Sequence, residues 1–194
     1  MPQFSYLLCL CIMLFSLGSS AQKSAFSFSA FTHATSLPGG TWAGAVHPGF
    51  DVGLQTRLKQ RENSRSYLNW KVGYYFHRLV HHGVQVYGEY NWDFNLYHGF
   101  GAGVAGGLGY LHTFEAHEIY KLGDDGTYNR SGRLGKAHAQ ISIATGLHYR
   151  LSNQWQPFLQ YRLRMITPFV NEYVPLLPAT SIHAGIFIPI ANNI

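Results

Sequence analysis

Residues 82–96, HGVQVYGEYNWDFNL, separate into two chemical classes when every second letter is read. Because successive side chains of a strand point to opposite faces, this pattern predicts one long strand with an apolar face and a polar face. The apolar face carries Val84, Val86, Gly88, Tyr90, Trp92, Phe94 and Leu96, and the polar face carries Gln85, Tyr87, Glu89, Asn91, Asp93 and Asn95. Which of the two faces meets water determines the class of the protein.

The same alternation recurs in seven further segments: 24–32, 50–58, 66–77, 100–114, 136–151, 155–166 and 181–190. Most segments have about ten residues or more, the length that a tilted strand needs to cross a bilayer. No apolar run after the N-terminal segment approaches the ~18 residues of a membrane helix. The sequence therefore predicts an all-β chain that forms an eight-stranded antiparallel up-and-down transmembrane β-barrel.

The connections between the predicted strands differ in length on the two sides of the barrel. Three alternate connections are tight polar turns, KQRENSR, NLYHG and LSNQ, whereas residues 33–49, 115–135 and 167–180 are long. A fourth connection on the side of the long ones, RLVHHG, is short. Short turns on one rim and mostly long loops on the other are typical of a bacterial outer-membrane barrel.

Side-chain volume distinguishes a barrel in lipid from a soluble lipocalin-like barrel, which has its apolar face inside. Side chains only just fill the interior of eight strands, and here the apolar faces carry large aromatic residues while the polar faces carry the glycines. Aromatic residues also gather towards both strand ends, which is typical of the girdles at the two membrane interfaces. We assign Phe26, Trp70, Trp92, Phe94, Tyr149 and Trp155 to the short-turn rim, and Phe76, Tyr110 and Phe114 to the other.

The N-terminal segment has the pattern of a secretory signal peptide. An apolar stretch from Leu7 to Leu17 is followed by Ser19 and Ala21, small residues placed for cleavage before Gln22. We therefore expect residues 1–21 to be removed and residues 22–194 to form the barrel domain. Because the cut removes both cysteines, the mature chain would carry no disulfide and no cysteine ligand.

Over residues 24–190 the chain resembles the superfamily of small eight-stranded bacterial outer-membrane barrels. Its last strand is similar to the terminal signal read by the barrel-assembly machinery, with His183, Gly185, Ile188 and Ile190 at that spacing and isoleucine in place of the usual aromatics. The alanine-then-glutamine cleavage site resembles outer-membrane proteins of Bacteroidetes-type bacteria. The resemblance implies a bacterial outer-membrane location, contact with outer-membrane lipids and insertion by that machinery.

Charged residues make up 12% of the chain, and the formal net charge is +5. The basic residues are scattered along the sequence, which argues against a nucleic-acid partner. Within the lumen we expect a polar network of Asp51, Arg57, Lys71, Glu89, Asp93, Arg150, Arg162 and Arg164. Such a network forms either an ion or solute path or a salt-bridged plug. Eight strands are too narrow for a porin-like pore, which favours the plug.

Most of the 11 histidines map to the predicted outer rim or its loops. Imidazole is a common transition-metal ligand, and His77, His81 and His82 are the best candidates for capture of a metal or haem. The alternative is that histidine suits a wet interface because it has an apolar body and a polar tip. No spacing matches a zinc motif, so we expect neither a metal nor a cofactor.

Ser181 and His183 lie on one face of the last predicted strand and are candidates for a nucleophile and its base. Some barrels of the superfamily modify lipid A. The barrel deacylases show histidine before serine on a lipid-facing surface, whereas here the order is reversed and both residues face the lumen. Ser142 and His138 form a weaker candidate pair.

Two of the long connections have distinctive sequences. KLGDDGTYN, residues 121–129, places Asp124 and Asp125 before Gly126, which predicts a hairpin turn in a protruding loop rather than a calcium site. Residues 167–179 are too apolar for a free loop in water. We expect this segment either to cover the mouth of the barrel or to dock on a partner protein or the outer leaflet. The residues that would make these contacts are Phe169, Val170, Tyr173, Leu176 and Leu177.

The leading functional hypothesis is a structural or accessory barrel in the bacterial outer membrane. It would have a plugged polar lumen and would bind an outer-membrane protein partner through its extracellular loops. One alternative is a lipid A-modifying barrel, an acyl hydrolase or acyltransferase. The other is a surface barrel that binds a metal or haem.

Overall fold

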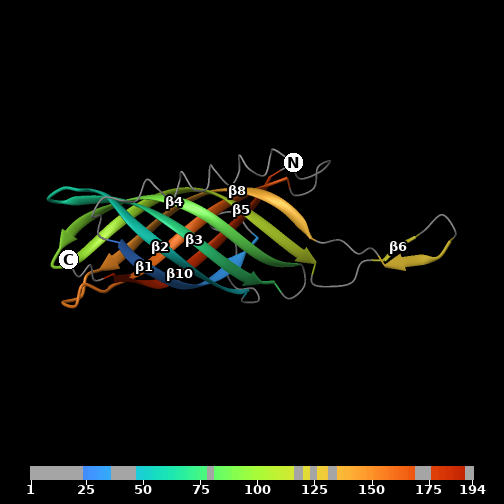
Figure 1. Cartoon of the computed structure of the whole chain (residues 1–194), viewed down its shortest axis with the longest axis horizontal. Helices are drawn as coiled ribbons and strands as arrows, with labels where there is room; N and C mark the ends of the chain where they lie inside the picture. Colours follow the sequence, from blue (N-terminus) through green and yellow to red (C-terminus); the bar gives the residue numbers. More distant parts are fainter. Residues whose placement is uncertain are drawn as a thin grey trace, which may run out of the picture.

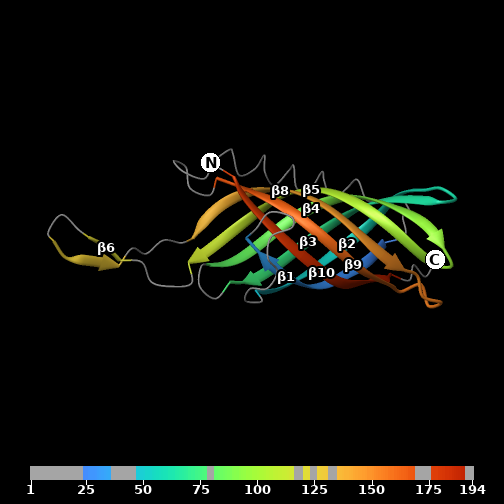
Figure 2. The same cartoon turned by 180° about the vertical axis from the view of Figure 1, so that it is seen from behind.

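Eight strands of the chain close into a barrel (Figures 1 and 2). The computed structural model describes residues 24–35, 47–77, 81–115, 120–122, 126–130, 135–168 and 176–190. The barrel strands are β1 (Ser24–Ala34), β2 (Pro48–Gln60), β3 (Ser64–Phe76), β4 (His81–Tyr97), β5 (Phe100–Glu115), β8 (Lys136–Tyr149), β9 (Gln156–Thr167) and β10 (Leu177–Pro189). The predicted signal peptide, residues 1–21, lies outside the described residues.

Neighbours around the barrel follow the order β1-β10-β9-β8-β5-β4-β3-β2, and every pair is antiparallel. The barrel closes where β1 pairs with β10, from Ala25 opposite Pro189 to Ala34 opposite Thr180. The predicted eight-stranded up-and-down fold is therefore confirmed. The described residues contain no helix that is long and apolar enough to cross a membrane.

The two faces of each strand differ as the alternation predicts. In β4 the side chain of Gln85 is 0% exposed and that of Glu89 is 1% exposed, whereas Val86 and Trp92 are 48% and 46% exposed. The polar set thus lines the lumen and the apolar set covers the outside. A barrel with an apolar exterior and a polar interior is built to be surrounded by lipid.

The two rims of the barrel also differ. The β2–β3, β4–β5 and β8–β9 connections, residues 61–63, 98–99 and 150–155, form one rim, which we call the short-turn mouth. His98 and Gly99 both have positive φ, as a two-residue hairpin of type I′ requires. The opposite rim, the long-loop mouth, receives the remaining connections.

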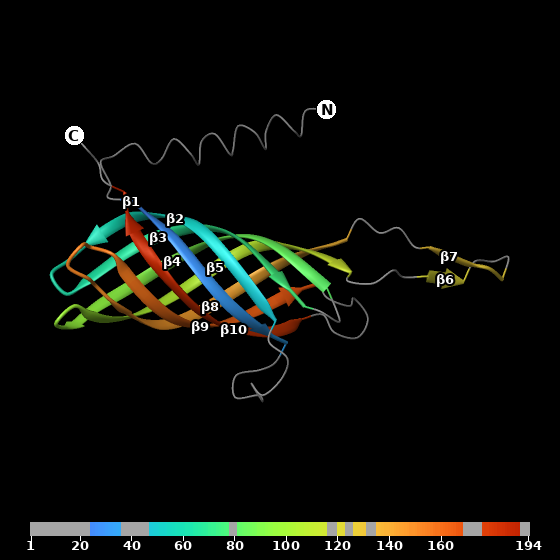
Figure 3. The ribbon, with the colours of Figure 1, turned by 90° about the horizontal axis from the view of Figure 1, so that it is seen from below.

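A small hairpin lies within the β5–β8 connection. Its strands, β6 (Tyr120–Leu122) and β7 (Tyr128–Arg130), pair antiparallel, and Figure 3 shows them beyond the rim where β5 ends. The hairpin predicted for residues 121–129 is therefore confirmed. Asp124 and Asp125, the calcium candidates, lie outside the described residues.

Large side chains enter the lumen where a glycine of the neighbouring strand makes room for them. A Cβ atom added to Gly83 would overlap the ring of Tyr75, and one added to Gly109 would overlap Tyr87. Tyr75 and Tyr87 are both buried. The polar faces therefore hold tyrosine rings as well as glycines, because the inward glycines create space for them.

Two sequence-based placements are wrong. Leu177, assigned to the apolar loop, begins β10 and packs against buried residues of the lumen. Trp70, assigned to the short-turn girdle, stands opposite Gly88, midway along β3. A Cβ atom at Gly88 would come within 2.8 Å of the Trp70 ring, so the indole covers a glycine rather than marking the interface.

The glycine arrangement predicts different effects for two substitutions in β5. Gly109→Val should destabilise the barrel by about 1–3 kcal/mol or prevent folding, because its Cβ would meet backbone atoms of β4, including the Val86 carbonyl oxygen at 2.6 Å. Gly106→Val should be tolerated, since no atom lies within 4 Å of the added Cβ. The folded fraction on an unheated detergent gel and urea unfolding would measure both. Equal tolerance of the two would contradict this packing.

Candidate functional site

A cluster of charged side chains crosses the middle of the lumen. Glu89 on β4 lies 2.7 Å from Arg162 on β9 and 3.2 Å from Lys71 on β3. Both contacts are ion pairs by distance, although the Glu89 oxygens form no well-aligned hydrogen bond. Asp51 on β2 lies 4.0 Å from Lys71. We call Asp51, Lys71, Glu89 and Arg162 the central cluster; all four are buried.

Tyr87 connects the two halves of the central cluster. Its hydroxyl donates to Asp51 Oδ2 over 2.9 Å and accepts from Arg162 over 2.6 Å. The two acids and two bases therefore sit within one network that spans non-adjacent strands. Buried charges persist only when they are paired in this way.

A second ion-pair group lies towards the short-turn mouth. Arg65 on β3 donates to Asp93 Oδ2 at 2.9 Å, and the Tyr67 hydroxyl donates to the same oxygen at 3.1 Å. His148 on β8 lies 3.7 Å from it. The turn predicted for KQRENSR includes Arg65, which is therefore absent from the expected lumen network. Its spacing of two from Tyr67 and four from Asn69, both inward residues, was the signal that could have found it.

Arg164 occupies the lumen on the other side of the central cluster. Its guanidinium donates to Gln85 Oε1 at 2.6 Å, lies 2.8 Å from His33 Nδ1 and stands over the rings of Phe31 and Tyr75. Above it, a small apolar layer closes the long-loop mouth, formed by Phe31, Tyr75, Leu111, Ile166 and Ala179 with Leu177 packed against them. This layer separates the charged lumen from the loops.

The two remaining arginines of the expected network, Arg57 and Arg150, lie elsewhere. Both are half-buried at the short-turn mouth, where they line a space with Arg65. Arg150 donates to Asn95 Oδ1 over 3.4 Å. The structure thus brings Asp51, Lys71, Glu89 and Arg162 together and leaves Arg57 and Arg150 apart from them.

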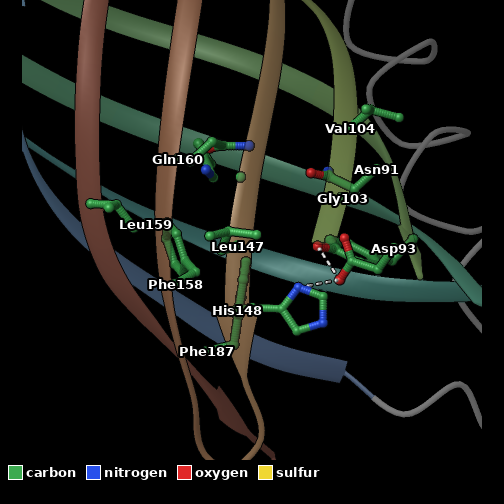
Figure 4. Close-up of a pocket in the computed structure, with 13 residues that line it drawn as sticks. Asn91, Asp93, Gly103, Val104, Leu147, His148, Phe158, Leu159, Gln160 and Phe187 are labelled. Carbon is green, nitrogen blue, oxygen red and sulfur yellow. Dashed lines mark hydrogen bonds and ion pairs between the residues drawn. The ribbon is translucent and has the colours of Figure 1, made fainter. Parts of the chain in front are cut away.

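Little free space remains in the middle of the barrel. A cavity beside Asp93 and His148 has a volume of about 30 Å³ (Figure 4), room for one or two water molecules. The side chains that line it come from strands on both sides of the lumen. Between this cavity and the apolar layer the central cluster fills the cross-section, so the geometry is that of a closed plug.

Ser181, His183 and Asp51 form an array with the contacts of a catalytic triad. Ser181 Oγ lies 2.9 Å from His183 Nε2, and His183 Nδ1 lies 3.2 Å from Asp51 Oδ2. Ser29 also contacts both His183 and Asp51. The sequence predicts the Ser–His pair but not Asp51 as its third member, because β2 and β10 are not neighbours in the sheet.

The array is closed to substrate. Ser181 and His183 are each 0% exposed, and the His183 ring stacks on Phe31 at a centroid distance of 4.4 Å. Acyl transfer needs space for a carbonyl carbon beside the nucleophile and donors for the oxyanion. With no exposed surface on serine or histidine, the array serves to satisfy the buried Asp51. The weaker pair, Ser142 and His138, is buried as well, and His138 contacts Thr113.

The candidate metal ligands do not converge on one point. His81 and His82 are consecutive in β4 and therefore face opposite sides of the barrel wall. His81 contacts Tyr75 in the lumen, and His82 contacts Tyr74 on the outside. His77 stacks on His47, and burial together with His47 lowers the pKa of His77. No group of three metal-ligating side chains occurs in the part of the chain that the structure describes.

The apolar loop is described only at its two ends, residues 167–168 and 176–179. Phe169, Val170 and Tyr173 lie outside the described residues, while Leu176 is exposed. Whether this segment covers the mouth or docks on a partner therefore stays a prediction. Of its five named apolar residues, Leu177 is the one that packs against the apolar layer.

No protein-family model and no curated protein matches the sequence. Among solved structures, the chain is similar to Neisserial surface protein A, with 12% identity over 87% of this chain and 97% of that chain and a TM-score of 0.55. It is also similar to Ail of Yersinia pestis (9% identity, 88% and 100% covered, TM-score 0.47) and to the outer membrane enzyme PagL (15%, 88% and 100%, 0.45). Of these three, only the first has a TM-score above 0.5, and at 12% identity it shows a similarity of fold alone.

The chain is thus an eight-stranded β-barrel of the bacterial outer-membrane type. Its exposed band of large apolar side chains is the surface that such a barrel presents to lipid. Fold and exterior together assign the chain to the outer membrane.

Removing one charge from the central cluster should lower the free energy of unfolding far more than removing one at the rim. Glu89→Gln leaves Lys71 and Arg162 without their shared carboxylate, so we expect a loss of about 3–5 kcal/mol in the free energy of unfolding. Glu115→Gln is the matched control, because its ion pair with Lys136 at 3.4 Å is partly exposed and should contribute at most about 1 kcal/mol. Urea unfolding in detergent would compare them, and similar losses would contradict a plugged lumen.

Proposed function

We propose that the chain is a closed structural or accessory barrel that acts through its extracellular loops on a partner protein of the outer membrane. The observation that carries the proposal is the central cluster, which fills the lumen with mutually paired charges. A lumen filled in this way offers no path for ions or solutes. The activity of such a barrel then resides in the parts that project from it.

Two features of the long-loop side support a docking role. The β6–β7 hairpin extends beyond the barrel rim (Figure 3) and carries an exposed Tyr128. The sequence between β9 and β10 is strongly apolar, and Leu176 at its end is exposed. Aromatic and apolar residues are the usual anchors of protein interfaces.

The proposal predicts that the purified barrel does not conduct. In planar bilayers we expect no discrete current steps at molar salt, because the charged side chains of the lumen bind one another. Insertion must be verified in the same membranes by protease protection. Stepwise conductance from the wild-type protein would contradict the closed lumen.

Affinity purification tests the partner. A tagged chain extracted in mild detergent should retain a stoichiometric outer-membrane protein. Replacing residues 169–176 by glycine and serine should release that protein, since the change stops before β10 and leaves Leu177 in place. Replacement of residues 38–46, in another connection at the same mouth, is the matched control and should retain the partner. Loss in both variants, or a barrel that always purifies alone, would contradict the proposal.

Lipid A modification is the second candidate, and the Ser181–His183–Asp51 array is the observation that favours it. The complete burial of the array argues against it. A fluorophosphonate probe should leave Ser181 unmodified, and lipid A should be unchanged in a strain that lacks the protein. Labelling mapped to Ser181, together with altered lipid A, would make the chain an enzyme.

A further inference from the structure

The short-turn mouth opens into a space of about 470 Å³ that the central cluster does not occupy. It is lined by the side chains of Arg57, Arg65 and Arg150 and by the amides of Gln55, Gln154 and Gln156. These residues come from β2, β3, β9 and the β8–β9 connection, at the left of Figure 3. We call this space the vestibule.

Positive charge in the vestibule exceeds the negative charge available to it. Asp93 is engaged by Arg65 and by the Tyr67 hydroxyl. Arg150 has a neutral partner, Asn95. Within the described residues no carboxylate forms an ion pair with Arg57 or Arg150. Three guanidinium groups therefore share a half-buried space with one carboxylate.

An amide donor at the same place also lacks a partner. Gln156 is 5% exposed, and its Oε1 accepts from Arg65. Its Nε2 is buried and has no hydrogen-bond partner among the described residues. Buried polar groups are nearly always satisfied, so an unpaired donor indicates a missing acceptor.

The arginines without a carboxylate and the unpaired amide of Gln156 would all be satisfied by an anionic acceptor. Partly buried positive charges are unfavourable without a counter-ion, and burial together with the neighbouring Arg65 lowers the pKa of Arg150. The guanidinium nonetheless stays charged at any physiological pH. Guanidinium forks and amide N–H groups are the donors that bind oxyanions in bidentate geometry.

We propose that the vestibule is a binding site for a phosphate-bearing anion that enters from the short-turn side. Its volume exceeds that of a single phosphate and falls within the range of small-molecule sites. In barrels of this type the short turns face the periplasm. The phosphate would therefore belong either to a soluble periplasmic compound or to a lipid headgroup of the adjacent leaflet.

Calorimetry with pyrophosphate tests the site on the folded wild-type protein in a zwitterionic detergent. We expect one binding site whose affinity falls with salt. Arg57→Gln/Arg150→Gln should weaken binding at least tenfold, since it removes two charge-assisted contacts. Lys59→Gln/Arg61→Gln is the matched control, because it removes the same charge from exposed residues of the same rim that do not line the vestibule. It should change affinity by no more than about twofold.

The two sources of phosphate can be separated in nanodiscs. If phosphatidylglycerol added to phosphatidylcholine discs weakens pyrophosphate binding to the wild type and to the control variant more than to an Arg150→Gln variant, the headgroup occupies the site. Unchanged binding assigns the site to a soluble anion. Either result supports the vestibule as a phosphate site.

Three results would overturn the proposal. The first is absence of pyrophosphate binding to the wild type, and the second is an equal loss of affinity in both double variants. The third is binding that appears only after residues 191–194 are deleted, since the chain itself would then fill the vestibule. Each variant must first show the wild-type gel shift on heating. If the double variant fails to fold, Arg150→Gln alone should still weaken binding severalfold.

Discussion

The lumen of eight strands is just wide enough for side chains, and this constraint governs the rest of the structure. A charge placed there meets no bulk water, so its partners must come from the barrel itself. Glu89 satisfies two cations, and Tyr87 ties Arg162 to Asp51. The contact between Glu89 and Lys71 joins neighbouring strands, whereas those of Arg162 with Glu89 and Tyr87, and that of Tyr87 with Asp51, join strands that are not neighbours in the sheet. They therefore hold the barrel at one shear and one register, since a shift of a single residue would turn the cluster towards lipid.

Glycines in the barrel wall provide the space that these large side chains occupy. Some large inward side chains lie beside an inward glycine of the neighbouring strand that gives them space, as Tyr75 does beside Gly83. The lumen is thus packed by complementary size across strands rather than by small residues alone. The same principle explains why a serine, a histidine and an aspartate lie in triad order without being accessible. Their hydrogen bonds satisfy a buried carboxylate, and geometry without space for a substrate does not provide catalysis.

The sequence predicted the structure correctly wherever apolar and polar side chains alternate along a strand. It predicted eight strands, the inward and outward faces and the short and long rims, because these depend on local alternation and on turn length. Leu177 was misassigned because a strand end carries no periodic signal of its own. Asp51 was missed as a partner of His183 because their meeting depends on how strands close across the barrel. For His81 and His82 the error was the opposite one. Their adjacency in the sequence suggested a shared metal ion, but consecutive residues of a strand face opposite sides of the barrel wall.

Water-edited and lipid-edited solid-state NMR of the protein in bilayers would test the central claim most directly, because it needs no substitution. Outward residues such as Val86 and Trp92 should receive magnetisation from acyl chains. The side chains of Gln85, Glu89 and Arg162 should receive little from either lipid or water, whereas Arg57 and Arg150 should exchange readily with water. Rapid water transfer to Glu89 and Arg162 would show a hydrated lumen and contradict the account of a barrel closed by its own charges.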